Sequence, residues 1–249
     1  MTGSYLSHFR HNMTEIMKIS NENKTTDNRS SSTYVFHDVG FHGDSHLLSL
    51  VDHIITSADI TCFVETGANV GSTVTYIAKR YPEISCYSCE PDKMAFELAK
   101  QNTAGLDNVS LYNLTSQEFL KILEKEITDI KINNTLFWLD AHGYGFTWPL
   151  KEEVAFVTGK IKQGYMLIDD FKVPGNEAFG YDSYNGQTCS YDYIKDSFAT
   201  NNFKLYYPCY KEKTSKHHPL RGWGLFVMGS DMSIPVELKN KVYREDIAN

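Results

Sequence analysis

The sequence has no block of basic residues, no long apolar run and no apolar segment near its start. Its 24 Lys and Arg residues against 31 Asp and Glu residues give the 249-residue chain a net charge of −7. An acidic chain is a poor candidate for nucleic-acid binding, because that binding depends on neutralising phosphates with basic side chains. A membrane-spanning helix needs roughly 20 apolar residues, and a secretory signal needs a continuous apolar core. We therefore expect a cytoplasmic protein without a nucleic-acid or membrane partner.

Cysteines are also few, and their pattern argues against a disulfide framework. The five cysteines are odd in number and scattered along the chain, at positions 62, 86, 89, 189 and 209. Cys86 and Cys89 have the spacing of a zinc or redox pair, but they lie in a strand-like run, where residues three apart point to opposite faces. The sequence contains no second pair of this kind. We interpret the two residues as buried strand thiols.

The first 33 residues differ in composition from the rest of the chain. Apolar side chains recur at helical spacing over 4–19, whereas 20–33 (SNENKTTDNRSSST) are almost entirely polar. We predict an N-terminal helix and polar linker over 1–33 and one domain over 34–249. The helix packs on its own domain or on a partner, so the sequence leaves a homo-oligomer open.

Helical periods and short apolar runs alternate from residue 44 onward. We expect helices over 44–58, 71–81, 91–105, 116–127 and 149–161, and strands over 60–66, 84–90, 109–115, 135–141 and 164–171. Asp44 or Ser45 is the expected cap of the first helix, and Pro91 is expected in the first turn of the third. Such alternation predicts an α/β fold with a doubly wound, mostly parallel sheet. Two further strands, over 203–210 and 223–229, predict an antiparallel closing pair.

The first strand of the predicted sheet ends in a glycine-containing turn, ETGANVGST. Gly67 and Gly71 permit a tight turn and a close approach of the backbone to a ligand. Their spacing differs from the G-x-G-x-x-G of dinucleotide-binding proteins, which disfavours an NAD-dependent oxidoreductase. Glu65 would repel a pyrophosphate but attract a cation such as S-adenosylmethionine. Glu90, at the end of the second strand, can accept both hydroxyls of a ribose.

These residues resemble class I S-adenosylmethionine-dependent methyltransferases over roughly residues 45–230. The motifs that carry the resemblance are FVETGANVG, the acid in SCEPD and the segment LYNLTSQEFL. The resemblance implies that Glu90 holds the ribose and that Thr115 or Ser116 lies beside the adenine. Contacts to the methionine end are implied for Glu65, Gly67, Asn69 and Gly71. The alternative interpretation is a glycine turn with ordinary surface acids.

Three further carboxylates are expected at the same edge of the sheet. Asp140 ends the fourth strand, and Asp169 and Asp170 end the fifth. Without a counter-charge they would repel one another and raise at least one pKa. A divalent cation with hard oxygen ligands, Mg²⁺ or Mn²⁺, would remove that repulsion. The alternative for Asp169 or Asp170 is a hydrogen bond to the backbone of the following turn.

The same acids, together with DAH at 140–142, resemble the metal-dependent O-methyltransferases of the macrolide-sugar (mycinamicin and macrocin) and catechol types. The resemblance implies that Asp140, Asp169 and Asp170 bind the metal and that His142 is the general base. A structural hydrogen bond is the alternative for His142. Three other histidines, His37, His42 and His46, precede the first strand, and nothing in the sequence selects one of them for the site.

A long segment after the paired acids, 172–198, carries several aromatic residues among Gly, Asn and Ser. Long loops in compact domains often bind substrates. The aromatic rings of this segment could stack on a sugar or an aromatic ring, and Trp148 could line the same pocket; the candidates are Phe179, Tyr181, Tyr184, Tyr191 and Tyr193. Packing in a helix of the domain is an equal alternative for Tyr191, Tyr193 and Phe198.

The sequence thus predicts an S-adenosylmethionine-dependent O-methyltransferase with Mg²⁺ or Mn²⁺ and a small diol substrate, such as a sugar. Asp140 and His142 are its predicted catalytic residues. A metal-independent methyltransferase and a non-catalytic S-adenosylmethionine-binding protein are the alternatives.

Overall fold

The computed structural model describes residues 34–126, 134–141, 148–199, 202–215, 218–229 and 234–245. The helix and linker predicted over 1–33 lie outside these ranges, as does His142. Among the described residues, no helix combines the length and the apolar character that crossing a bilayer requires.

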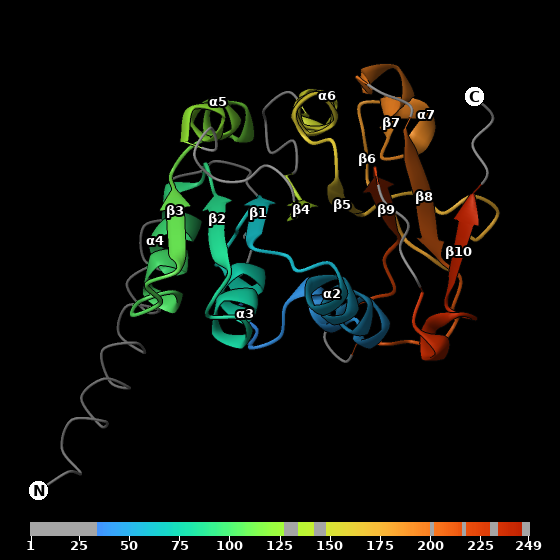
Figure 1. Ribbon diagram of the computed structural model, residues 1–249, viewed down its shortest axis with the longest axis horizontal. Helices are drawn as coiled ribbons and strands as arrows, with labels where there is room; N and C mark the ends of the chain where they lie inside the picture. Colours follow the sequence, from blue (N-terminus) through green and yellow to red (C-terminus); the bar gives the residue numbers. More distant parts are fainter. Residues whose placement is uncertain are drawn as a thin grey trace, which may run out of the picture. The chain divides into compact units, whose positions relative to one another are not determined.

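An eight-stranded sheet forms the centre of the domain, with the strand order β10-β8-β9-β5-β4-β1-β2-β3 (Figure 1). The five strands from β5 to β3 are parallel, and β9, β8 and β10 pair antiparallel to their neighbours. The parallel strands are β1 (Cys62–Thr66), β2 (Ser85–Cys89), β3 (Val109–Tyr112), β4 (Thr135–Leu139) and β5 (Gly164–Asp169). The antiparallel strands are β8 (Phe203–Pro208), β9 (Trp223–Met228) and β10 (Val242–Glu245). The doubly wound parallel sheet and its closing strand pair are therefore confirmed.

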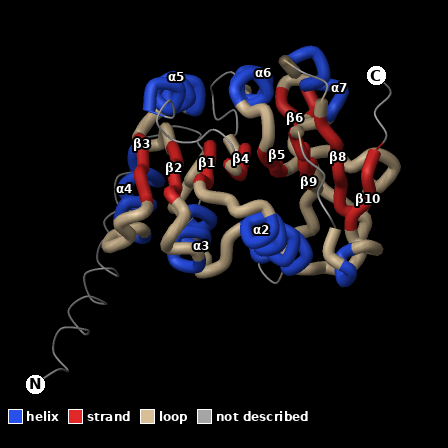
Figure 2. Tube along the Cα trace, in the orientation of Figure 1, coloured by secondary structure: helices blue, strands red, loops and turns tan. Residues whose placement is uncertain are grey.

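Helices cover both faces of this sheet (Figure 2). One side carries α2 (Ser45–Ser57), α3 (Ser72–Arg80) and α4 (Lys93–Asn102). The other side carries α5 (Ser116–Glu126), α6 (Leu150–Lys160) and the short α7 (Tyr191–Ile194). Because both faces are covered, every residue of β1, β4 and β5 is buried.

Strand order reverses at β1, since β2 and β3 lie on one side of it and β4 and β5 on the other. In doubly wound sheets ligands bind beyond the carboxyl ends of the strands at such a reversal. The loop from β1 to α3, the ends of β2, β4 and β5, and the segments packed over them are therefore where a site is expected.

Two aspartates set the first residues of their helices. Asp44 accepts hydrogen bonds from the backbone N–H groups of His46 (3.0 Å) and Leu47 (3.2 Å), so it caps α2. Asp92 caps α4 in the same way, with both N–H groups at 2.9 Å. The α4 helix consequently begins at Lys93. The expectation that Pro91 lies in its first turn was wrong, because the side chain of Asp92 satisfies the free N–H groups there.

The segment predicted as a long loop contains regular structure of its own. A two-stranded hairpin, β6 (Ser183–Tyr184) with β7 (Gln187–Thr188), precedes α7. The edge strand β10 was not predicted, and it pairs with β8. All five cysteines are free thiols. Cys86 and Cys89 are buried in β2, as expected for strand thiols.

Candidate functional site

The loop between β1 and α3 holds its shape through left-handed backbone conformations. Gly67 and Gly71 have φ of +84° and +80°, and Asn69 has φ of +49°. A Cβ on Gly67 would lie only 2.8 Å from the carbonyl carbon of Asp140 and closer still to its oxygen. Glycine at 67 therefore lets the loop pack directly on the residue that follows β4.

Glu90, immediately after β2, supports this loop. One carboxylate oxygen accepts a hydrogen bond from the backbone N–H of Asn69 (2.7 Å), and the other accepts one from the N–H of Asp92 (2.8 Å). Burial raises the pKa of Glu90, and these two N–H donors oppose the rise. Each carboxylate oxygen can accept a second hydrogen bond, so the group can hold the loop and still bind a ligand hydroxyl.

Glu65 occupies a different environment from Glu90. It is 1 % exposed, and its carboxylate accepts a hydrogen bond from the hydroxyl of Ser88 on β2. Burial raises the pKa of Glu65 to about 8, against the opposing effect of the Ser88 hydrogen bond. Glu65 is thus packed between the strands beneath the loop, and a cation placed there would favour its ionised form.

The two residues proposed beside an adenine play different structural roles. Thr115 and Glu118 form a capping box at the start of α5: the Thr115 N–H donates to the Glu118 carboxylate (3.1 Å), and the Glu118 N–H donates to the Thr115 hydroxyl (3.4 Å). The Ser116 hydroxyl is buried and has no hydrogen-bond partner among the described residues. Ser116 is therefore the one with unused hydrogen-bonding capacity.

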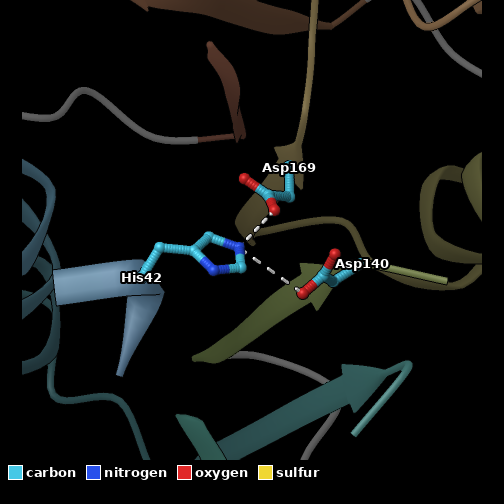
Figure 3. A group of neighbouring side chains, drawn as sticks. All are labelled: His42, Asp140 and Asp169. Atoms are coloured by element: carbon cyan, nitrogen blue, oxygen red, sulfur yellow. Dashed lines mark hydrogen bonds and ion pairs between the residues drawn. The ribbon is translucent and has the colours of Figure 1, made fainter. Parts of the chain in front are cut away.

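A histidine and two aspartates from three distant segments meet where β4 and β5 end (Figure 3). The Nε2 atom of His42 lies 2.7 Å from an oxygen of Asp169 and 3.9 Å from an oxygen of Asp140. One ligand atom from each residue can be chosen so that all lie within 4.8 Å of one another. Such a group can hold a proton or a cation between its members.

Burial and three nearby carboxylates determine the pKa of His42. Burial opposes a charge on the ring, but the carboxylates of Asp169, Asp140 and Asp170 outweigh burial and raise the pKa of His42 to about 10. The rings of His42 and His218 stack at 4.4 Å between centroids. The local field therefore strongly favours positive charge at this point.

Asp170 lies outside the group of His42, Asp140 and Asp169. Its backbone has φ of +51°, and its carboxylate pairs with the Nε of Arg221. Arg221 also contacts Asp182 through its NH2 group (2.5 Å). Burial and the neighbouring Asp169 raise the pKa of Asp170 to about 7, and Arg221 opposes that rise. The adjacent acids of IDDF are thus divided between two different partners.

His42 was considered in the sequence only as one of three histidines before the first strand. Its contact with Asp169 joins residues that are 127 positions apart, so no local pattern indicates it. The GFHGD segment offered one hint, since glycines on both sides of His42 favour a tight turn. His46, by comparison, pairs with Glu212 at 3.0 Å. His142 stays a predicted base that the structure does not describe.

Packing accounts for most of the aromatic residues of 172–198. The indole of Trp148 stacks on Tyr193 (5.0 Å between centroids) and contacts Tyr184 edge-on (5.5 Å). Phe198 stacks on Phe203 of β8 at 4.4 Å. A hollow nearer the cluster is lined by His42, Asp169, Ser215, Arg221 and other residues. Its volume of about 10 Å³ has room for roughly one water molecule beside Asp169.

Comparisons with known proteins agree with the fold. No family model matches the chain, and no curated protein sequence does. A crystal structure of a candidate O-methyltransferase from Klebsiella pneumoniae is similar over 78 % of this chain and 83 % of its own, with 16 % identity and a TM-score of 0.54. An O-methyltransferase from Bacillus cereus in complex with SAH covers 87 % of this chain and 90 % of its own, with 13 % identity and a TM-score of 0.54. TomG of Streptomyces achromogenes is an O-methyltransferase involved in tomaymycin synthesis, in complex with SAM. Its match covers 74 % of this chain and 78 % of the TomG chain, with 12 % identity and a TM-score of 0.51. At these identities the likeness shows the fold alone: that of the class I methyltransferases.

Proposed function

We propose that this protein is an S-adenosylmethionine-dependent O-methyltransferase that acts on a hydroxyl of a small diol, with a divalent cation at the acceptor. One observation carries the proposal. Glu65, Glu90, Asp140 and Asp169 end four neighbouring parallel strands around a glycine loop, at the reversal of strand order. Negative charge gathered at that place suits a cationic cofactor and a bound cation.

The residues around the glycine loop fit S-adenosylmethionine. Gly67 and Gly71 give the loop the left-handed turns that bring its backbone over the strand ends. Glu90 has acceptor capacity for ribose hydroxyls, and the buried Ser116 hydroxyl can bond to a base. Glu65, whose pKa is about 8 without a ligand, would ionise beneath the methionine end when a cationic cofactor binds there. When bound, this cofactor supplies a methyl group on a sulfonium, which is a good leaving group.

The residues at the ends of β4 and β5 fit a divalent cation. Asp140 and Asp169 provide hard oxygen donors within reach of one ion. When bound, such a cation lowers the pKa of a hydroxyl that it contacts. Asp140 and Asp169 would hold such a cation close to the glycine loop, because Gly67 packs directly on Asp140. His142 is the proposed acceptor of the hydroxyl proton, because histidine is basic near neutral pH.

A small molecule with two adjacent hydroxyls is the acceptor that this arrangement suits best. Two oxygens on one cation fix the orientation of the acceptor, and orientation is a large part of the rate of a bimolecular displacement. A sugar or a catechol meets this requirement.

The test compares cofactor binding with turnover. Calorimetry should detect S-adenosylmethionine but not NAD, and S-adenosylhomocysteine should form with members of a panel of catechols and sugar diols. Glu90→Gln should weaken cofactor binding at least about tenfold, because charged hydrogen bonds contribute about 1.5–3 kcal/mol. Glu83→Gln, in the exposed turn two residues before β2, is the matched control and should leave binding unchanged.

Three outcomes would contradict parts of this proposal. Absence of cofactor binding would overturn it as a whole. Cofactor binding without S-adenosylhomocysteine formation across the panel would favour a non-catalytic binding protein. Full turnover in excess EDTA would remove the cation and favour a metal-independent methyltransferase.

A further inference from the structure

The cation site contains a nitrogen donor that the acidic strand ends do not predict. His42 precedes the sheet by about twenty residues, yet its Nε2 atom lies between the carboxylates of Asp169 and Asp140 (Figure 3).

We propose that the cation at this site is held by one imidazole and two carboxylates, from His42, Asp140 and Asp169, and that this donor set selects a first-row transition ion over Mg²⁺. The inference rests on the proposed function, whose cation it identifies by class. Imidazole is a good ligand for Zn²⁺, Co²⁺ and Fe²⁺, whereas Mg²⁺ prefers oxygen donors and water.

The placement of His42 is built into the fold. The buried ring of Phe41 packs edge-on against Trp138 of β4, at 4.9 Å between centroids. The backbone N–H of Phe41 donates to the Thr73 hydroxyl (3.2 Å), and the Ser215 hydroxyl donates to the carbonyl of His42 (2.6 Å). His42 is therefore anchored on both sides of its Cα.

That anchoring holds a backbone conformation that L-residues rarely adopt. Phe41, His42 and Gly43 all have positive φ, of 52°, 53° and 71°. The left-handed conformation is unfavourable for both non-glycine residues, Phe41 and His42. Strain of this kind persists where surrounding contacts enforce it, and it is concentrated at functional sites. Its effect here is to aim an imidazole at the carboxylates.

The spacing of the donor atoms suits one shared ion. Two donors that each lie about 2.1 Å from a transition ion, at the angles of octahedral or tetrahedral coordination, are about 3.0–3.4 Å apart. The Nε2 of His42 is 2.7 Å from the Asp169 oxygen and 3.9 Å from the Asp140 oxygen. These two values bracket the expected range, and the chosen oxygens of Asp140 and Asp169 lie within 4.8 Å of each other, so the three side chains would close slightly around an ion.

Asp170 forms a salt bridge with Arg221 and is not part of the cluster of His42, Asp140 and Asp169. The guanidinium of Arg221 pairs with both Asp170 and Asp182. The backbone N–H of Asp182 also donates to the carbonyl of Asp170 (3.0 Å). Moving the Asp170 carboxylate onto a metal ion would break the contact with Arg221, so Asp170 stays outside the ligand set.

The experiment measures cation binding directly, by calorimetry on chelator-treated full-length protein with Co²⁺, Zn²⁺ and Mg²⁺ in turn. Wild-type protein should bind Co²⁺ and Zn²⁺ at least about tenfold more tightly than Mg²⁺. His42→Ala should weaken Co²⁺ and Zn²⁺ binding by at least about tenfold. Replacing a residue that only hydrogen-bonds to a metal ligand already weakens metal binding by about that factor, and His42 is proposed as a ligand itself. His46→Ala removes a histidine–carboxylate pair of the same segment outside the cluster, and it should leave cation binding unchanged.

A second pair of measurements keeps the inference open to refutation if His42→Ala fails to fold. Asp170→Asn should retain Co²⁺ affinity within about threefold, because that carboxylate is held by Arg221. Pulsed electron paramagnetic resonance of the Mn²⁺-loaded wild-type protein should show coupling to an imidazole nitrogen. Loss of binding in Asp170→Asn with normal binding in His42→Ala, or a spectrum without nitrogen coupling, would overturn the inference.

The outcomes separate this inference from the proposed function. Unchanged S-adenosylmethionine binding and turnover, together with preference for Mg²⁺, would overturn only the donor set proposed for the cation. Absence of any cation binding would overturn both the donor set and the role of a cation, and cofactor binding would still decide the methyltransferase.

Discussion

Replacement of Gly67 by alanine should be among the most damaging single-methyl changes in this protein. The added Cβ would lie 2.8 Å from the carbonyl carbon of Asp140 and 3.0 Å from the Cα of Ala141. Both atoms belong to backbone that continues directly from the buried strand β4, so they cannot rotate out of the way. Either the glycine loop or the end of β4 has to move.

The size of the effect follows from two contributions. A left-handed conformation costs a non-glycine residue about 1–2 kcal/mol, and forcing a methyl group into packed structure costs about 1–3 kcal/mol. Alanine also reduces the conformational freedom of the unfolded chain, which raises the free energy of unfolding by about 0.4–1 kcal/mol. We therefore expect Gly67→Ala to lower the free energy of unfolding by about 1–4 kcal/mol, with each kcal/mol lowering Tm by about 2–4 °C.

Gly105 provides a matched control for the backbone contribution. It has the same φ of +84°, and a Cβ there would meet no atom within 4 Å. Urea unfolding followed by circular dichroism should show Gly67→Ala to be less stable than Gly105→Ala by about 1–3 kcal/mol, the packing contribution alone. Equal losses in the two variants would refute the contact with Asp140. Because this contact adjoins the cluster, Gly67→Ala should also weaken cation binding, and Gly105→Ala should not.

Two further predictions concern the remaining polar residues of the site. Thr115→Ala should lower the free energy of unfolding, measured by urea titration, by about 1 kcal/mol through loss of the helix cap. Ser116→Ala should leave the free energy of unfolding unchanged or higher, but it should weaken S-adenosylmethionine binding measured by calorimetry. The opposite pattern in the two variants would contradict these roles. Glu65 has its pKa raised by burial from 4.5 to about 8, so the folded state binds more protons than the unfolded state in this range and stability should fall as pH rises from about 4.5 to about 8. Glu65→Gln lacks this titration, and its stability relative to wild type should increase over the same interval in urea titrations at successive pH values; a constant difference would contradict the assigned pKa.

The parts of the fold that the sequence predicts are those controlled by local pattern. Apolar runs of strand length identified the buried strands β1, β4 and β5, because strands covered on both faces need apolar side chains throughout. The positions of Asp140 and Asp169 at strand ends followed from the same runs. Alternation of helices and strands then predicted the parallel sheet that brings these ends to one edge.

The parts that were missed depend on contacts across the chain. Nothing near His42 specifies that its ring meets Asp169, and nothing near Asp170 specifies its pairing with Arg221. Both depend on where the loops pack once the sheet exists. The pairing of β10 with β8 is likewise a long-range contact without a strong local signal. The aromatic residues of 172–198 were ambiguous for a related reason, since their composition suits a binding surface and a packed layer equally.

The separation in sequence of the residues in the cluster has a consequence for folding. His42 and Asp169 are 127 positions apart, and the central strands β1 and β4 lie between them in the sequence. Contacts that close such large loops form late, because loop closure costs entropy before the contact returns free energy. A cation that binds all three residues would therefore recognise only chains whose sheet is complete. By mass action it would stabilise those chains against unfolding, so the rate at which cation affinity appears during refolding would report the final step of assembly.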